Sequence, residues 1–142
     1  ALNYHGKNVD AIVRRMNLKI EQGCSFFLTQ PVYGDWDIER IALLKERTGA
    51  KILCGLMPLV SYKNALFMST EMPGIRVPQE IVDRYSPDMS RAEAEEVAKQ
   101  VSLDIATKMK DITDGYYFMV PFNRVQLICS IINEIREKSS KF

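Results

Sequence analysis

The chain contains little cysteine and a single histidine. Its 142 residues include three cysteines, Cys24, Cys54 and Cys129, which lie far apart and have no C-x-x-C spacing. We interpret them as small core residues in a reducing compartment, because neither a disulfide framework nor a zinc site fits this pattern. His5 has no acid or nucleophile partner near it in the sequence, so we expect a frayed terminal side chain. The sequence therefore predicts no metal site and no catalytic residue on this chain.

The sequence also lacks a charge excess and a long apolar run. The formal net charge is +1, which gives no support for broad binding to nucleic acid or to an anionic membrane. No apolar run approaches membrane-spanning length, and no signal peptide is visible. Phosphate-binding loops, the G-x-G-x-x-G fingerprint and H-E-x-x-H are absent. We expect a cytoplasmic protein with no nucleic-acid partner and no membrane association.

Three apolar runs each end at a proline and precede a helical pattern. They cover residues 25–31, 52–58 and 116–121. No two runs are close enough for a hairpin, so the order of elements predicts an α/β fold with parallel strands. Ligands bind just beyond the carboxyl ends of such strands. The candidate site therefore lies in residues 30–36, 58–64 and 121–124.

Helical periodicity fills the segments between these runs. Asn8 can cap a first helix, Ser90 and Glu93 form a capping box, and Asn123 can cap the last helix. The predicted helices cover about residues 9–22, 35–47, 61–72, 79–85, 90–109 and 123–138. No linker divides residues 1–142, which we interpret as one domain. A closed (β/α)₈ barrel needs about 250 residues, so three strands indicate either a small open sheet or the later part of a barrel.

Three polar residues lie at the predicted strand ends. Gln30 offers one acceptor and two donors in a plane, which suits a flat heterocycle; alternatively it caps a turn. Arg124 would lie in the first turn of a helix, where a cation opposes the helix dipole and suggests a nearby anion. Its alternatives are a solvated surface side chain or a salt bridge to a neighbouring loop. Asn64 belongs to the same ring of loops, or is a plain surface amide.

Basic and aromatic side chains add weaker candidates. Arg15 and Lys19 are one helical turn apart and could hold a phosphate, although such pairs are more often solvated. Tyr33 and Trp36 could stack on a ligand or cover the end of the sheet, and we favour packing. The residues alone predict a ligand-binding α/β sheet.

Four segments resemble the methylenetetrahydrofolate reductase family. Residues 19–33 are similar to its "K-x-x-x-G-A-x-[FY]-x-[IL]-T-Q" segment, and residues 55–65 to its "G-I-[ML]-P-[LIV]" strand and following helix. Val77-Pro78 resembles its "V-P" before a short helix. Residues 115–124 are similar to its closing "G-x-H-F-[YM]-T-x-N-R". The Pro31-Val32-Tyr33 version most resembles the reductase halves of bifunctional homocysteine methyltransferase–reductases.

The resemblance implies a flavin-dependent TIM barrel that reduces 5,10-methylenetetrahydrofolate to 5-methyltetrahydrofolate with NAD(P)H, a step of one-carbon metabolism and methionine biosynthesis. It places this chain at about strands six to eight, the C-terminal portion of the barrel. Gln30 matches a glutamine that contacts folate and nicotinamide, and Arg124 an arginine that contacts folate. Lys19 and Arg15 match helix positions that touch FAD, and Asn3 falls near a loop position that contacts the flavin.

The sequence departs from the family at several positions. Asn64 stands where some members have a folate-contacting glutamine, and Met68 where some have a stacking phenylalanine. The acidic residue of strand one and the loops after strands two to five, which hold most of the flavin, are absent. We therefore expect a fragment that supplies part of the folate side and is inactive alone. Its partner would be the missing barrel half or a second copy.

Two other interpretations stay open. The same half-barrel could be a self-associating binding module without catalysis, because it would expose the edge of its first strand and apolar helix backs. It could also be an unrelated phosphate-binding α/β protein.

Overall fold

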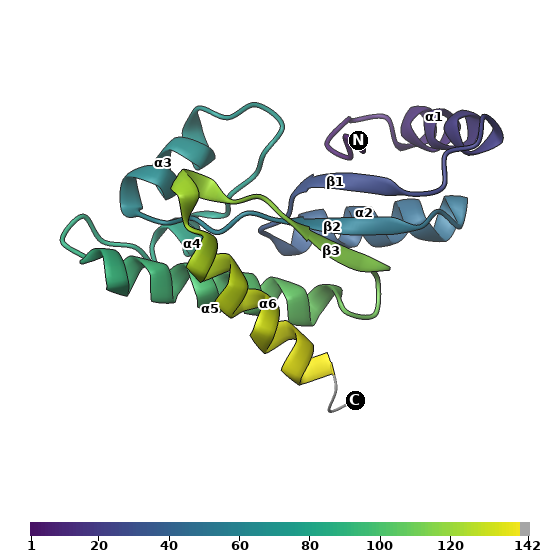
Figure 1. The fold of residues 1–142 in the computed structure, drawn as a ribbon. Helices are drawn as coiled ribbons and strands as arrows, with labels where there is room; N and C mark the ends of the chain where they lie inside the picture. The colour runs from purple at the N-terminus through teal and green to yellow at the C-terminus, as the bar shows by residue number, and fades with distance from the viewer. Residues whose placement is uncertain (140–142) are drawn as a thin grey trace.

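A computed structural model describes residues 1–139 (Figure 1). Helices and strands alternate for most of its length. In chain order the elements are α1 (Val9–Glu21), β1 (Phe27–Pro31), α2 (Asp35–Thr48), β2 (Ile52–Leu56), α3 (Tyr62–Thr70), α4 (Gln79–Val82), α5 (Arg91–Met109), β3 (Gly115–Phe118), the 3₁₀ turn η1 (Pro121–Asn123) and α6 (Val125–Ser139).

The three strands form one parallel sheet in the order β1-β2-β3. The prediction of an α/β fold with parallel strands is confirmed. The outer edge of β1 is partly covered, because the Leu2 N–H donates to the Leu28 carbonyl at 2.7 Å and Leu2 pairs with Thr29. This corrects the expectation of an exposed first strand. Within residues 1–139 the unpaired edge of the sheet belongs to β3.

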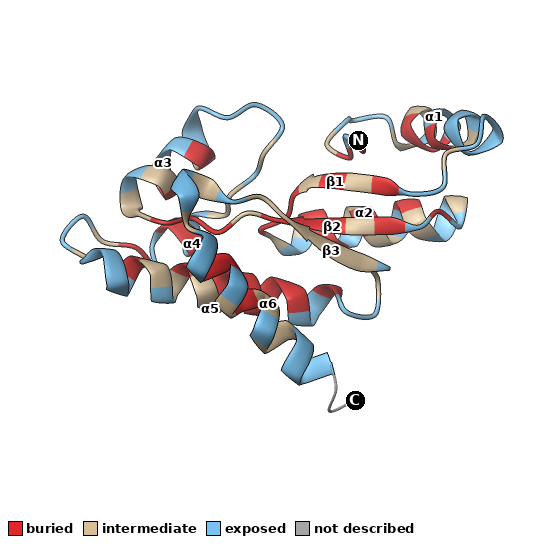
Figure 2. Cartoon of the chain, in the orientation of Figure 1, coloured by how far each residue is buried: buried red, intermediate tan, exposed pale blue. Residues whose placement is uncertain are grey.

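The core lies between the sheet and the helices that pack on it. Figure 2 shows buried residues on β1 and β2 and on the inner sides of α2 and α5, whereas β3 is only partly buried. Ile41 of α2, Ile52 and Cys54 of β2 and Met109 of α5 have no exposed surface. Fully burying a large aliphatic side chain contributes about 1.5–3 kcal/mol, so this layer is the main stabilising unit.

The three cysteines are free, as the sequence indicates. Cys54 is the core residue that we expected, and burial raises the pKa of its thiol to about 12. Cys129 is exposed on α6, so its assignment to the core is wrong. It lies two positions before the buried Ile131, where the helical period turns a side chain away from the core.

The start of α6 differs from the prediction. Phe122 and Asn123 have φ values of 50° and 58°, in the left-handed region. Two such residues cannot continue into a right-handed helix, so Asn123 does not cap α6 and the helix begins at Val125. The first helical bond runs from the Ile128 N–H to the Arg124 carbonyl at 3.2 Å. Arg124 therefore precedes the first turn and does not lie within it.

Other boundaries moved by a few residues. The first strand covers Phe27–Pro31 where 25–29 was expected, because Ser25 and Phe26 lie exposed before the sheet begins. The third strand is Gly115–Phe118, and the short helix ends at Val82. Asn8 and Ser90 cap their helices as predicted. Among the described residues, no helix combines the length and apolar character needed to cross a membrane.

Candidate functional site

Tyrosine hydroxyls hold the carbonyl groups near the carboxyl ends of β1 and β2. Four of them donate to backbone: Tyr4 to Pro31 at 3.1 Å, Tyr33 to Met57 at 2.7 Å, Tyr85 to Leu59 at 2.8 Å, and Tyr117 to Thr29. Burial raises the pKa of each of the first three phenols above its usual value of 10, so they stay protonated donors. These bonds hold the backbone in place near the carboxyl ends of β1 and β2, where the candidate site lies.

Sequence reasoning missed these tyrosines as a set. Tyr33 was assigned correctly to packing, since its side chain is 4% exposed. The only signal was the composition, six tyrosines in 142 residues. Because each partner carbonyl is 24 or more positions away, no local pattern could identify the bonds.

Gln30 lies near the carboxyl end of β1, where the pairing register shifts between Leu28 and Pro31. Such irregularities are common beside active sites, where they redirect a side chain. The residue is half-buried, and its side-chain amide makes no hydrogen bond within residues 1–139. The alternative that it caps a turn does not occur. Its acceptor and two donors remain available to a ligand.

Arg124 is held by an ion pair with Glu95 of α5, at 2.6 Å between Nη1 and Oε1. The two side chains are only 18% and 27% exposed. The expectation of a cation within the first turn of a helix is wrong, and the structure shows a salt bridge whose partner belongs to helix α5 and not to a neighbouring loop. Arg124 also lines a cleft of about 520 Å³ between the start of α3 and the start of α5. One guanidinium carries five N–H donors, so a bond to Glu95 leaves others for a ligand.

Asn64 stabilises the start of α3. Its Oδ1 accepts the Val60 N–H at 3.1 Å, and its own N–H donates to the Ser61 hydroxyl at 3.0 Å. Ser61 and Lys63 line the same cleft as Arg124, so the structure places Asn64 beside that cleft. Its side-chain oxygen is engaged by the backbone, which limits Asn64 to a supporting role there.

The three residues matched to FAD contacts come together. Asn3, Arg15 and Lys19 line one cavity of about 90 Å³, together with Phe27 at the start of β1. Neither Arg15 nor Lys19 has an ion-pair partner among residues 1–139. Gln30 lies three residues further along β1, about 10 Å away at the usual rise of a strand. Leu2, which also lines this cavity, pairs with Thr29 next to Gln30, so the basic cavity lies along the outer edge of β1 and extends toward its carboxyl end.

His5 is not a frayed residue, which corrects the sequence interpretation. Its Nε2 lies 3.3 Å from Oδ1 of Asp37 in the first turn of α2, and the side chains are 11% and 1% exposed. The other Asp37 oxygen accepts the N–H groups of Tyr33 and Gly34, both at 3.2 Å. Burial lowers the pKa of His5 and raises that of Asp37. The pair lies where the N-terminal segment packs against α2.

Trp36 covers this pair. Its ring stacks on His5 at 5.5 Å between centroids, and the guanidinium groups of Arg76 and Arg40 lie 4.3 and 4.8 Å from its ring. Trp36 therefore closes the carboxyl edge of the sheet by packing, which is the alternative that the sequence favoured.

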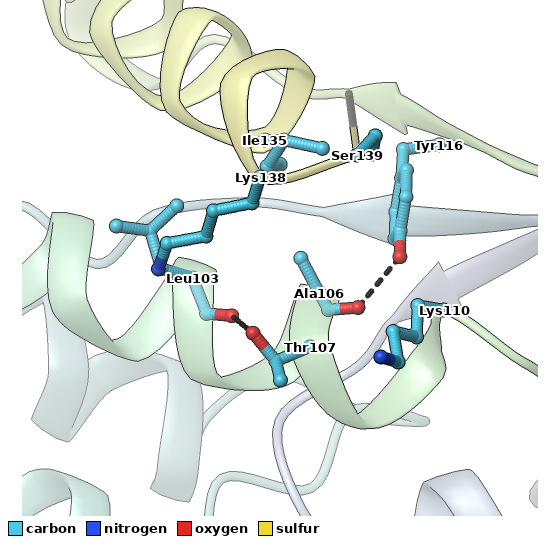
Figure 3. Close-up of a pocket in the computed structure, with 8 residues that line it drawn as sticks. All are labelled: Leu103, Ala106, Thr107, Lys110, Tyr116, Ile135, Lys138 and Ser139. Carbon is cyan, nitrogen blue, oxygen red and sulfur yellow. Dashed lines mark hydrogen bonds between the residues drawn. The ribbon is translucent and has the colours of Figure 1, made fainter. Parts of the chain in front are cut away.

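An apolar pocket of about 320 Å³ lies away from this edge, between α5, α6 and β3 (Figure 3). Leu103, Ala106 and Ile135 form its walls. The Tyr116 hydroxyl at its rim donates to the Ala106 carbonyl at 2.6 Å. The pocket lies on the helix side of the sheet and shares no residue with the strand ends, so we do not assign it to the functional site. No cluster of three or more metal-ligating side chains occurs among residues 1–139.

Comparisons with known proteins bear on the fold and the family of the chain. One solved structure similar to this chain is described as an uncharacterized protein from Clostridium thermocellum that binds two copies of 5-methyl-5,6,7,8-tetrahydrofolic acid. The TM-score is 0.53 and the identity 21%, over 89% of this chain and 47% of that one, so the likeness concerns the fold. This chain spans about half the length of that protein. No curated protein matches the sequence. Residues 2–136 match the family model described as methylenetetrahydrofolate reductase, and the chain belongs to that family.

Proposed function

We propose that the chain is the C-terminal part, about strands six to eight, of a methylenetetrahydrofolate reductase barrel, and that residues 1–142 form one partial domain. One observation carries this proposal: the family match covers residues 2–136, whereas the chain spans only 47% of a similar solved protein. The free edge of β3 is where a parallel sheet would continue. The unpaired cysteines support a cytoplasmic location.

The reaction proposed for the whole protein is reduction of 5,10-methylenetetrahydrofolate to 5-methyltetrahydrofolate with NAD(P)H. FAD, when bound, would supply the hydride-transfer chemistry between the nicotinamide and the folate. On this chain, the amide of Gln30 would orient the pterin ring through its planar donors and acceptor. Arg124, steadied by Glu95, would hold a carbonyl or carboxylate of the folate, with Asn64 shaping the cleft. The folate ligand of the similar solved protein supports this assignment.

The cavity of Asn3, Arg15 and Lys19 fits only part of FAD. About 90 Å³ and two unpaired cations suit a group the size and charge of a phosphate, and not a flavin ring. These residues would hold the diphosphate, while most contacts to the cofactor would come from residues outside this chain. We therefore propose that the isolated chain neither reduces folate nor oxidises NAD(P)H.

Titration of the 142-residue chain with 5-methyltetrahydrofolate tests the folate site. We expect weak, saturable binding that falls about tenfold in Gln30→Ala, the loss of roughly 1.4 kcal/mol expected when a ligand loses well-placed hydrogen bonds. Gln100→Ala is the matched control, because Gln100 is exposed on α5 and bonded only to Glu96. Equal affinities in both variants would contradict the role of Gln30. A flavin spectrum with NADH oxidation by the isolated chain would contradict its inactivity.

A second candidate function is a self-associating module without catalysis. The observation that favours it is a set of three exposed apolar side chains that follow β3 in the chain, Val120, Phe122 and Val125, which are 47%, 68% and 57% exposed. A parallel sheet with such an edge can pair with a second copy or with the missing barrel half. The folate titration separates the two functions, since a pure association module would bind no folate.

A further inference from the structure

Tyr117 of β3 reaches across the middle strand of the sheet. Tyr117 is the register partner of Gly55 on β2, and Gly55 is the register partner of Pro31 on β1. A Cβ atom on Gly55 would lie 2.8 Å from the Tyr117 hydroxyl and 2.9 Å from its Cζ, so the phenol ring lies directly over this glycine. The hydroxyl continues to the carbonyl of Thr29 on β1, to which it donates a hydrogen bond. One side chain thus links the two outer strands.

The bond ends at the irregular part of β1. Leu28 pairs with Leu53, and Pro31 pairs with Gly55. The advance of three residues along β1 therefore lies opposite an advance of only two residues along β2. The hydroxyl of Thr29 accepts the Gly55 N–H at 2.9 Å, and its carbonyl accepts the Tyr117 hydroxyl. Both acceptors of Thr29 are therefore occupied by its neighbours. The irregularity has a fixed shape because the neighbouring strands hold it from two sides.

The Thr29 carbonyl belongs to the same peptide plane as the Gln30 nitrogen. Fixing the orientation of that plane fixes the backbone direction from which the Gln30 side chain leaves β1. Gln30 itself has no side-chain partner within residues 1–139 that could hold its amide. Without the bond from Tyr117, a ligand that hydrogen-bonds to the amide would have to order the backbone of Gln30 as it binds. The entropy lost in that ordering would reduce the affinity.

We propose that Tyr117 is a positioning residue for Gln30, and that Gly55 is required because it alone lets the phenol cross β2. The hydroxyl of Tyr117 holds the peptide before Gln30 so that the free amide faces its ligand in one orientation. This inference rests on the proposed function only for the identity of that ligand, a folate.

Substitution Tyr117→Phe removes the hydroxyl and keeps the ring. We expect the side-chain amide resonances of Gln30 in an ¹⁵N-labelled sample to shift and broaden, with the amide losing its single orientation. Affinity for 5-methyltetrahydrofolate should fall about fivefold, the loss expected of one neutral hydrogen bond. Gly55→Ala should give the same changes at Gln30, because the added methyl pushes the phenol away from Thr29.

Tyr116→Phe is the matched control. Tyr116 is the adjacent residue of β3, and its hydroxyl donates to the Ala106 carbonyl on the helix side of the sheet. This variant loses a comparable bond but should leave the Gln30 resonances and the folate affinity unchanged. A purely structural role for Tyr117 would make the two variants behave alike.

The two proposals can fail separately. Unchanged Gln30 resonances in Tyr117→Phe would overturn the positioning role, whether or not folate binds. If the wild-type chain does not bind folate while the Gln30 resonances still move in Tyr117→Phe and Gly55→Ala, positioning stands and the folate assignment fails.

Discussion

Asp114 connects three parts of the fold at the start of β3. Its Oδ2 accepts the Ile52 N–H at 2.9 Å and a hydrogen bond from the Lys45 ammonium of α2, while its own N–H donates to the Ile52 carbonyl at 2.9 Å. The Lys45 bond, then the Ile52 N–H, hold the pKa of this carboxyl below its usual 3.8. The ionised form therefore stabilises the folded state.

This carboxylate gives the protein a defined acid sensitivity. Because the folded pKa lies below the unfolded one, the stabilisation is fully present above about pH 4 and is lost as pH falls through the folded pKa. Asp114→Asn should be less stable than wild type at pH 7, and the difference in unfolding free energy should shrink below pH 4. Urea unfolding at several pH values measures this. A difference that does not depend on pH would contradict the prediction.

The cysteines should differ in reactivity according to burial. Cys129 is exposed, whereas Cys54 is fully buried with a thiol pKa of about 12. Iodoacetamide at pH 7.5 should modify Cys129 within minutes and leave Cys54 intact until the chain is unfolded, because the thiolate is the nucleophile. Mass spectrometry of peptides, with and without urea, gives the extent at each site. Equal labelling of both cysteines in the folded protein would show that the core is open.

At the scale of elements, α5 depends on its capping box. The Ser90 hydroxyl accepts the Glu93 N–H at 3.2 Å, and the Glu93 carboxylate accepts the Ser90 N–H at 2.8 Å. Ser90→Ala should lower the unfolding free energy by about 1 kcal/mol, the usual cost of losing an N-cap. Ser25→Ala is the control, since Ser25 is exposed in a loop and makes no hydrogen bond within residues 1–139. Chemical denaturation of both variants measures the difference, and equal losses would contradict the capping role.

Elements with local signals were predictable from the sequence. The capping box of α5 and the Asn8 cap of α1 lie within three or four residues of the groups they satisfy, so their patterns are visible in the sequence. The start of α6 was not predictable, because Asn123 has the chemistry of a cap and only the backbone at Phe122 and Asn123 rules it out.

Site features that depend on distant contacts were also hidden. The position of Gln30 near the end of a strand was predictable because a strand end is a local feature of the sequence. The His5–Asp37 pair was missed because its members are 32 positions apart and meet only when the N-terminal segment packs on α2. Arg124 was identified as notable for the wrong reason, since its partner Glu95 comes from another helix. The tyrosine bonds have the same origin in tertiary packing.

At the scale of the whole molecule, the open edge of the sheet is its main feature. The edge of β3 has no partner strand within residues 1–139, and Val120, Phe122 and Val125 lie just beyond it with large exposed fractions. Exposed apolar side chains next to an unpaired strand favour association with another chain.

We expect the isolated chain to associate as its concentration rises. Phe122→Glu should weaken this association by about 1–2 kcal/mol, since it removes a large apolar contact and adds a charge. Phe26→Glu is the control, because Phe26 is 52% exposed but precedes β1 at the other end of the sheet. Sedimentation velocity over a range of concentrations measures the shift. A monomer at all concentrations, or equal effects of both variants, would contradict an interface at the β3 edge.

The position of Trp36 has a practical consequence. It is the only tryptophan in the chain, so all indole emission comes from one ring stacked on His5 and flanked by Arg40 and Arg76. Movement of the segments around this ring changes its exposure to water, and the emission of an indole depends on that exposure. Emission at 295 nm excitation therefore offers an unlabelled optical readout of the end of the sheet where Gln30 lies. Trp36 takes no part in the proposed folate site, yet its fluorescence can report whether a ligand occupies that site.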